Sequence, residues 1–270
     1  MVQKLKSIIQ LLIQKILGYT NYLFIFSIYR IWRYRLLKDD IDFNYFIELT
    51  QSNRPSTIID IGANVGYTGV IFAKSLPNYQ IICYEPVSLL TNNILKVVSF
   101  FNVQNISIKH LALGNTNQIV PIKTPIIQGV KKQGLSYIDV SVERTDENHL
   151  RQFLVEQVQM VSLDSDLFIN ELLPIAGIKV DVENFEFFVL QGAVRLIKLY
   201  KPIVMAELWD NDRKFACIAL MNELGYQTKV IINKKLETYT SQQSLNYFFI
   251  PKYTKNLTIS NLTDENKAIH

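Results

Sequence analysis

From residue 55 onward, short apolar segments rich in β-branched residues alternate with longer segments that repeat apolar positions every three to four residues. The short segments predict buried strands, and the longer ones predict helices that cover them. This alternation is typical of a parallel sheet with helices on both faces. In the first half of the region we expect strands at 57–61, 80–85 and 106–112, and helices at 67–76 and 86–100.

The helical pattern lapses between residues 118 and 163 and then returns. Polar loops separate the apolar segments of this interval, which predicts an insertion of antiparallel strands near 119–122, 137–142 and 157–163. After it we expect strands at 178–182, 202–207, 227–232 and 247–250, and helices at 186–199 and 213–224. The predicted fold is α/β and Rossmann-like: a doubly wound, mostly parallel sheet with an antiparallel insertion and an N-terminal helical segment.

Composition and charge divide the chain into three parts. With 270 residues, 49% of them hydrophobic, the chain can bury one full-sized core. We place an apolar, basic helical segment at 1–45, the α/β domain at 46–255 and a polar tail at 256–270. Residues 1–38 contain seven basic residues and no acid, which leaves 21 basic against 24 acidic residues in the remainder. Because basic residues do not cover the domain, we expect no nucleic-acid partner.

The N-terminal segment has two interpretations. Its longest uncharged run, residues 16–29, has 14 residues, whereas a membrane-spanning helix needs roughly 20. The apolar part is not followed by a small-residue cleavage site, so it does not resemble a secretory signal. One interpretation is a helical cap on the domain or on a second subunit. The other is a peripheral membrane contact through residues 1–38, with Tyr29, Trp32 and Tyr34 among anionic headgroups. Both stay open, and the sequence indicates no oligomeric state.

Cysteine and histidine usage limits the chemistry that the chain can perform. Cys83 and Cys217 lie far apart, and the three histidines are scattered, so no zinc or redox motif is present. We therefore predict no metal site. A reducing, cytoplasmic location fits this composition, with membrane association if the N-terminal segment binds lipid.

Residues 60–66, DIGANVG, connect the first predicted strand to the first predicted helix. In a doubly wound sheet, ligands bind beyond the carboxyl ends of the strands. Gly62 and Gly66 permit close approach of the backbone to a ligand, and the helix start favours an anion such as a carboxylate. The spacing fits neither the G-x-G-x-x-G of dinucleotide sites nor the nucleoside-triphosphate loop.

Glu85 ends the second predicted strand, where an acid can accept hydrogen bonds from both hydroxyls of a ribose. An acid at this place fits any adenosine cofactor, but together with the D-x-G-x-N-x-G turn it favours S-adenosyl-L-methionine over NAD. The candidate cofactor-binding residues are Asp60, Gly62, Ala63, Asn64, Gly66, Tyr67, Glu85 and Pro86.

Several motifs, in order, resemble the FkbM family of methyltransferases. They are DIGANVGY at 60–67, YEP at 84–86, HLALG at 110–114, QMVSLD at 159–164 and IKVDVENFEFFVLQGA at 178–193. The resemblance covers residues 55–210. It implies a class I methyltransferase that uses S-adenosyl-L-methionine to methylate hydroxyl groups, often on sugars or polyketides. Asn184 stands where the family usually has glycine, and asparagine is the residue best able to replace glycine in a left-handed conformation.

Three acids are candidates for catalysis. Methyl transfer to oxygen requires alignment of acceptor and methyl group and removal of a proton. Asp181 and Glu183 end the strand next to the expected cofactor site, and Glu207 ends the neighbouring strand. We hypothesise that Asp181 faces cofactor and acceptor, while Glu183 or Glu207 serves as general base or orients the hydroxyl. Glu186 fits a structural role near a helix start. A carboxylate site for Mg²⁺ is the alternative, which chelator-insensitive transfer would exclude.

Two other functions compete with methyl transfer. A nicotinamide-dependent reductase would need Y-x-x-x-K, which occurs only from Tyr34 to Lys38, before the glycine turn. A degenerate cofactor-binding protein would need none of the acids. For the methyltransferase we expect a hydroxyl-bearing acceptor: a sugar, glycan, glycolipid or secondary metabolite. Its specificity should reside in residues 118–160 and in the N-terminal segment.

Overall fold

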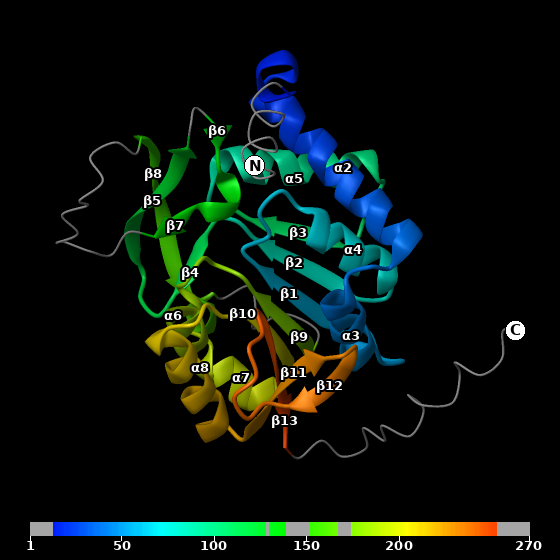
Figure 1. Ribbon diagram of the computed structural model, residues 1–270, viewed down its shortest axis with the longest axis vertical. Helices are drawn as coiled ribbons and strands as arrows, with labels where there is room; N and C mark the ends of the chain where they lie inside the picture. The colour runs from blue at the N-terminus through cyan, green and yellow to red at the C-terminus, as the bar shows by residue number, and fades with distance from the viewer. Residues whose placement is uncertain (1–12, 128–129, 139–151, 167–173, 253–270) are drawn as a thin grey trace, which may run out of the picture.

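The computed structural model describes residues 13–127, 130–138, 152–166 and 174–252. The predicted tail at 256–270 and the first 12 residues of the N-terminal segment lie outside these ranges. The central sheet is made of β1 (Thr57–Ile61), β2 (Gln80–Tyr84), β3 (Ile106–Lys109), β9 (Ile175–Val180), β10 (Ile203–Glu207), β11 (Tyr226–Ile232), β12 (Lys235–Thr238) and β13 (Asn246–Pro251). Their order across the sheet is β12-β11-β13-β10-β9-β1-β2-β3 (Figure 1).

Five neighbouring strands, from β10 to β3, run parallel, while β13, β11 and β12 pair antiparallel at one edge. From β1 the chain winds outward through β2 and β3, and then returns to build β9 and β10 on the other side of β1. The strand order therefore reverses at β1, and the crevice beyond the carboxyl ends of β1 and β9 is where such sheets bind ligands. This topology confirms the predicted doubly wound, mostly parallel α/β fold.

Two apolar cores cover the sheet because successive residues of a strand point to opposite faces. Ile58 of β1 packs on one side, whereas Ile59 and Ile61 pack on the other. The first core is covered by α2 (Tyr19–Leu37), α3 (Ile41–Thr50), α4 (Tyr67–Ser75) and α5 (Ser88–Phe100). The second is covered by α6 (Glu186–Gln191), α7 (Val194–Tyr200) and α8 (Asp212–Glu223), together with the insertion.

The strand predicted at 106–112 is wrong as a single strand. After Lys109 the chain leaves the central sheet, and residues 112–114 form β4 (Ala112–Gly114) in a second sheet. The change of sheet buries Ala112 and Leu113 beside Met160, whereas the four residues of β3 are only half-buried at the sheet edge. The remaining strands of the second sheet are β5 (Gln118–Ile127), β6 (Val130–Lys131), β7 (Tyr137–Ile138) and β8 (Gln152–Ser162).

The insertion is only partly antiparallel. β5 pairs antiparallel with β6, β7 and β8 as predicted, but β4 runs parallel to β8. Of the strand predicted at 137–142, residues 139–142 lie outside the described residues. In Figure 1 the second sheet stands beside the β3 edge and above α6.

The helix predicted at 186–199 is two helices, α6 and α7, separated at Gly192. The break between the two helices is held by Asp164, a residue that follows β8. Its carboxylate accepts hydrogen bonds from the backbone N–H groups of Arg195 (2.8 Å) and Leu196 (2.9 Å), so it caps the start of α7. Its own N–H donates to the Gly192 carbonyl at 2.8 Å.

The described part of the N-terminal segment packs on the α/β domain. α2 lies across α4 and α5 and buries Leu23, Ser27, Ile31 and Tyr34 (Figure 1). The predicted boundary at residue 45 falls inside α3, so one continuous helix joins the segment to the domain. Within the described ranges, the structure contains no helix with the length and apolar character needed to cross a membrane.

Candidate active site

The glycine turn brings the ends of β1 and β9 into backbone contact. Gly62 has φ +74°, and a Cβ at this position would lie 1.9 Å from the carbonyl oxygen of Asp181. The Asp181 N–H donates to the Ile61 carbonyl at 3.1 Å, and the Gly62 and Ala63 N–H groups donate to the Tyr84 carbonyl at 3.0 and 3.1 Å. The turn therefore fixes the ends of β1, β2 and β9 relative to one another.

Asn64 continues this turn in a left-handed conformation, with φ 52°. Its N–H donates to Glu85 Oε2 at 2.8 Å, while its own side-chain Oδ1 is buried without a hydrogen-bond partner among the described residues. A buried acceptor without a partner is costly unless a ligand or water satisfies it. Asn64 thus offers an acceptor to a molecule that enters the site.

Glu85 lies directly after β2 and is 4% exposed. Its second carboxylate oxygen accepts a hydrogen bond from the Val87 N–H at 2.9 Å, so each oxygen still has capacity for one more donor. Burial raises the pKa of Glu85 to about 8, although the hydrogen bonds from Val87 and Asn64 act in the opposite direction. A ligand that donates hydrogen bonds would satisfy this carboxylate.

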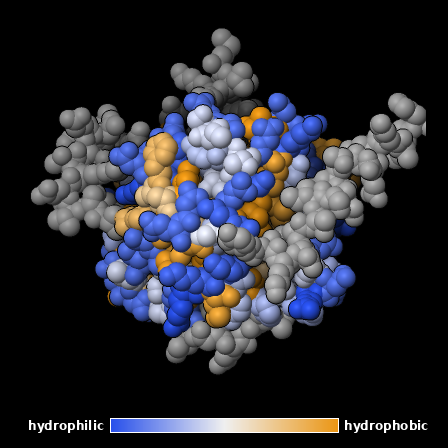
Figure 2. All heavy atoms as spheres, turned by 90° about the horizontal axis from the view of Figure 1, so that it is seen from below, coloured by the Kyte–Doolittle hydropathy of each residue, from blue (hydrophilic) through white to orange (hydrophobic). Residues whose placement is uncertain are grey.

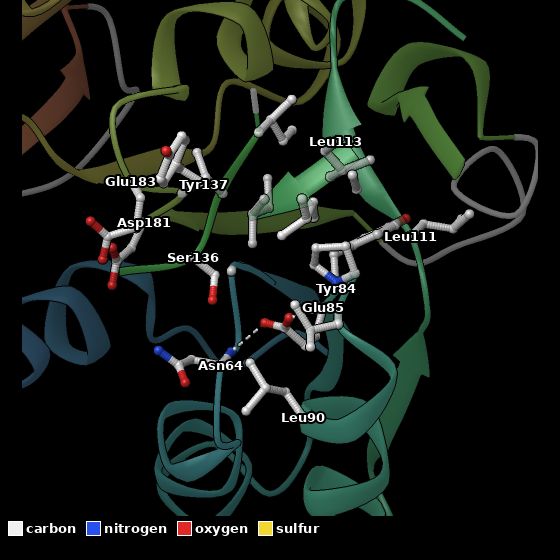
Figure 3. A pocket seen from close by; sticks show the side chains of 18 residues that line it. Asn64, Tyr84, Glu85, Leu90, Leu111, Leu113, Ser136, Tyr137, Asp181 and Glu183 are labelled. Carbon is white, nitrogen blue, oxygen red and sulfur yellow. Dashed lines mark hydrogen bonds between the residues drawn. The ribbon is translucent and has the colours of Figure 1, made fainter. Parts of the chain in front are cut away.

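These residues face an open cavity between the ends of β1, β2 and β9 and the second sheet. Figure 3 shows Asn64 beside Glu85, and Asp181 with Glu183 on a neighbouring part of the wall. Of the predicted site residues, the cavity is lined by Gly62, Asn64, Glu85, Pro86, Asp181 and Glu183. The second sheet and its approach also line the cavity, through a set of residues that the sequence analysis did not name individually, although it expected specificity to reside in 118–160: Leu111, Leu113, Ile122, Ser136, Tyr137 and Ile138.

Four predicted cofactor-binding residues lie behind this wall. Asp60 is fully buried, and its Oδ2 accepts a hydrogen bond from Thr68 Oγ1 at 2.5 Å. Ala63 is buried in the core, and Gly66, with φ 86°, directly precedes α4. Tyr67 lines a different cavity, and the Arg30 guanidinium lies 4.5 Å from the centre of its ring. These residues are placed to shape the turn from behind.

Lys179 is a site residue that the sequence reasoning missed. It is 5% exposed, and its Nζ donates to the Gly62 carbonyl at 3.1 Å. The same Nζ lies 3.3 Å from Asp60 Oδ1 and 3.4 Å from Asp181 Oδ2. Burial alone would lower the pKa of Lys179, but the charges of Asp181 and Asp60 outweigh it and raise the pKa. The available signal was a lysine inside an apolar strand, which must pair when buried.

The three candidate catalytic acids gather where β9 and β10 end. Glu183 lines the cavity. Its pKa is raised to about 8, mainly by burial and to a smaller extent by the charges of Asp181 and Glu207. Glu207 is the last residue of β10 and does not line the cavity. Burial, and then the charge of Asp181, raises its pKa to about 7, although the charge of Lys179 and a hydrogen bond from the Trp209 side chain act in the opposite direction. Both carboxyls are therefore poised to exchange protons near neutrality.

Glu186 holds the loop that presents Glu183. Its Oε1 accepts hydrogen bonds from the N–H groups of Val182 (3.1 Å) and Asn184 (3.2 Å). Asn184 has φ 71°, so the predicted left-handed conformation is confirmed, and its Oδ1 accepts a hydrogen bond from Asn211 at 2.9 Å. Within the described ranges, no group of three or more His, Cys, Asp or Glu side chains is arranged to hold a metal ion.

A model of the FkbM methyltransferase domain matches residues 60–228, which span the glycine turn, the insertion and the acid cluster. The chain belongs to the FkbM methyltransferase family. The family match confirms the resemblance read from the motifs and places the doubly wound sheet among class I methyltransferase folds. No protein of curated function matches the chain.

Solved structures with similar folds accompany the FkbM match. One is an FkbM methyltransferase from Methylobacillus flagellatus KT, with 12% identity, a TM-score of 0.46, and coverage of 84% of this chain and 54% of that one. A SAM-dependent O-methyltransferase from Thermotoga maritima has 9% identity, a TM-score of 0.45, and coverage of 84% and 73%. A ribosomal protein L11 methylase from Lactobacillus delbrueckii subsp. bulgaricus has 9% identity, a TM-score of 0.43, and coverage of 78% and 77%. The chain spans about half the length of the Methylobacillus protein.

Proposed function

We propose that this FkbM methyltransferase uses S-adenosyl-L-methionine to methylate a hydroxyl group of a sugar, glycan, glycolipid or secondary metabolite. One observation carries the proposal. The same cavity exposes a ribose-type acceptor pair, Glu85 with Asn64, and a cluster of proton-accepting acids, Asp181 and Glu183. A cofactor and an acceptor can therefore be bound next to each other in one site.

The cavity wall suits the parts of the cofactor. Glu85 has one free acceptor position on each oxygen for the two ribose hydroxyls, and Asn64 Oδ1 is a further acceptor. The absence of a side chain at Gly62 lets the Asp181 backbone approach the turn closely, which places Asp181 beside the proposed cofactor site. Leu90, Leu111 and Leu113 provide an apolar surface for an adenine ring. When bound, the cofactor supplies a methyl group activated by the positive charge of a sulfonium.

The acids suit the removal of a proton from an acceptor hydroxyl. Glu183 faces the cavity, and its pKa of about 8 makes it a stronger base than an ordinary carboxylate once it has lost its proton. Asp181, held by Lys179 at 3.4 Å, is placed to orient the acceptor. Glu207 lies behind them and is the second candidate for the base, with a pKa of about 7.

Isothermal titration with S-adenosylhomocysteine tests the cofactor assignment. We expect wild-type protein to bind it, and Glu85→Ala to bind about 100-fold more weakly, because two charge-assisted hydrogen bonds are worth about 3 kcal/mol together. Glu223→Ala, which removes an exposed acid at the end of α8, is the matched control and should bind as wild type does. Binding of NAD(P) without any binding of S-adenosylhomocysteine would instead support the reductase.

Transfer from radiolabelled S-adenosyl-L-methionine to a glycan and glycolipid extract tests the reaction. We expect label in one of these fractions with wild-type protein and a loss of at least about 100-fold with Glu183→Gln, at unchanged S-adenosylhomocysteine affinity. Equal labelling by wild type and a Glu183→Gln/Glu207→Gln variant would show that neither acid is the base. A protein that binds cofactor and labels no fraction would fit the degenerate alternative.

A further inference from the structure

The helix α2 is apolar on the side that faces away from the domain. Ile25, Tyr29, Trp32 and Leu36 follow one another at spacings of four, three and four residues, which places them in one line along the helix. Each is between 46% and 75% exposed. The opposite side is already buried against the domain. A helix that is apolar on both sides is normally buried on both sides, so the outer line requires a partner.

The apolar surface continues onto α5. Phe100 is exposed, and its ring lies 5.7 Å from that of Phe24 of α2, in an edge-to-face arrangement. Leu95 of α5 is also exposed. α2 and α5 pack side by side (Figure 1). We call this surface the α2–α5 face; its residues are Ile25, Tyr29, Trp32, Leu36, Leu95 and Phe100.

The other exposed apolar residues of the described ranges include Ile119, Leu154 and Val155 of the second sheet and single residues on other helices. On the face of the molecule seen in Figure 2, hydrophobic residues gather in several patches that lie between hydrophilic ones. Leu199 of α7 and Phe215 of α8 are as exposed as the residues of the α2–α5 face, but they lie on separate helices. Single exposed apolar side chains are ordinary on soluble proteins, whereas a contiguous apolar line marks an interaction site.

The charges around the α2–α5 face are positive. The Arg35 guanidinium lies 5.0 Å from the centre of the Trp32 ring, and Lys38 and Lys96 are exposed at the ends of α2 and within α5. Among the described residues, no carboxylate lies within salt-bridge distance of these three cations. Arg30 and Arg33, in contrast, are used in ion pairs with Asp40 and Asp39. Of the three cations, Arg35 lies next to the exposed tryptophan. The Lys38 Nζ lies 4.7 Å from the centre of the Tyr34 ring, and Lys96 of α5 lines a hollow with Thr20 of α2.

We propose that the α2–α5 face binds the surface of an anionic lipid bilayer. Tyr29 and Trp32 would lie at the level of the headgroups, the aliphatic side chains would enter the acyl boundary, and Arg35, Lys38 and Lys96 would contact lipid phosphate. Charge selects this partner over a second copy of the chain. A two-fold contact would place each basic face against the same basic face, and residues 1–38 contain no acid to compensate.

Vesicle flotation of the full chain tests this proposal. We expect the protein to float with phosphatidylcholine vesicles that contain about 30% phosphatidylglycerol, and to remain unbound with pure phosphatidylcholine. Trp32→Ser/Leu36→Ser should reduce binding at least about tenfold, and Arg35→Gln/Lys38→Gln should reduce it about tenfold, because each basic residue near an anionic surface contributes to binding. Binding of wild type should also weaken in about 0.5 M salt.

The matched control is Leu199→Ser/Phe215→Ser, which removes equally exposed apolar side chains from other helices and should float as wild type does. S-adenosylhomocysteine titration or a urea melt shows that each variant is folded. The proposal is overturned if wild type does not bind the anionic vesicles, or if Trp32→Ser/Leu36→Ser floats like wild type. It is also overturned if wild type sediments as a dimer, Trp32→Ser/Leu36→Ser sediments as a monomer, and neither wild type nor this variant floats with the vesicles.

Discussion

Lys179 Nζ lies 3.3 Å from Asp60 Oδ1, and both side chains are closed to solvent. The pair joins the next-to-last residues of β9 and β1 beneath the glycine turn, and Lys179 also donates to the Gly62 carbonyl. A buried ion pair of this kind sets the relative position of two strand ends more than it stabilises the protein, since both ions lose their hydration. It ties Asp181, at the cavity, to the turn that the cofactor should contact.

Lys179→Met should therefore destabilise the protein by about 3–5 kcal/mol, because Asp60 would keep a buried charge with only the Thr68 hydroxyl, and no opposite charge, beside it among the described residues. Urea denaturation at pH 7 measures the loss. Adding Asp60→Asn to this variant removes the uncompensated charge and should restore a large part of the stability. A single variant as stable as wild type would show that Asp60 does not depend on Lys179.

Gly62→Ala should destabilise the protein by at least about 3 kcal/mol and abolish S-adenosylhomocysteine binding. A left-handed backbone costs an alanine about 1–2 kcal/mol, and the new Cβ would also meet the Asp181 carbonyl oxygen at 1.9 Å. Gly225→Ala is the matched control, since Gly225 has φ +86° but only Lys201 Nζ within 4 Å, at 4.0 Å. It should lose only the backbone contribution, about 1 kcal/mol, and bind normally. Equal effects of the two changes would contradict the role of the close contact.

Asn93→Ala should weaken S-adenosylhomocysteine binding about tenfold, because Asn93 holds the glycine turn from behind. Its Nδ2 donates to the Val65 carbonyl at 2.9 Å and to Ser27 Oγ of α2 at 3.0 Å. The loss of these buried hydrogen bonds should also cost about 2 kcal/mol of stability. Asn105→Ala is the control: Asn105 donates to three carbonyls in the last turn of α4 and just after it, away from the site. It should be destabilised similarly but bind with unchanged affinity in a calorimetric titration.

The cofactor-free protein should lose stability as the pH rises from about 5 to 8. Burial raises the pKa of Glu85 and Glu183 to about 8, and that of Glu186 and Glu207 to about 7. In the unfolded chain these groups release their protons near pH 4.3. Between the unfolded pKa near 4.3 and the folded pKa values of about 7 and 8, the folded state binds more protons than the unfolded state, so a rise in pH favours unfolding. Urea midpoints at pH 5.5 and 8.5 measure the change, and Glu183→Gln should show a smaller fall. A midpoint that rises with pH would contradict these shifts.

The sequence determined the fold class and the place of the cofactor turn. The short apolar segments that alternate with helical segments predicted β1, β2, β9 and β10. The spacing of Gly62 and Gly66 predicted a turn, and both glycines have positive φ in the structure. These features are local, because hydrophobic periodicity and the freedom of glycine depend on neighbouring residues alone. The family motifs were local in the same way, which is why the assignment could be read before the structure.

Only the tertiary structure decided which residues face the cavity. Asp60 is the next-to-last residue of β1 and Glu85 directly follows β2, yet Asp60 is turned into the core toward Lys179, while Glu85 lines the cavity. The departure of the chain from the central sheet after Lys109, and the approach of Tyr137 to the cavity, likewise depend on pairing between strands distant in sequence. Contacts across such distances follow from how whole layers pack, and periodicity along one segment does not encode them.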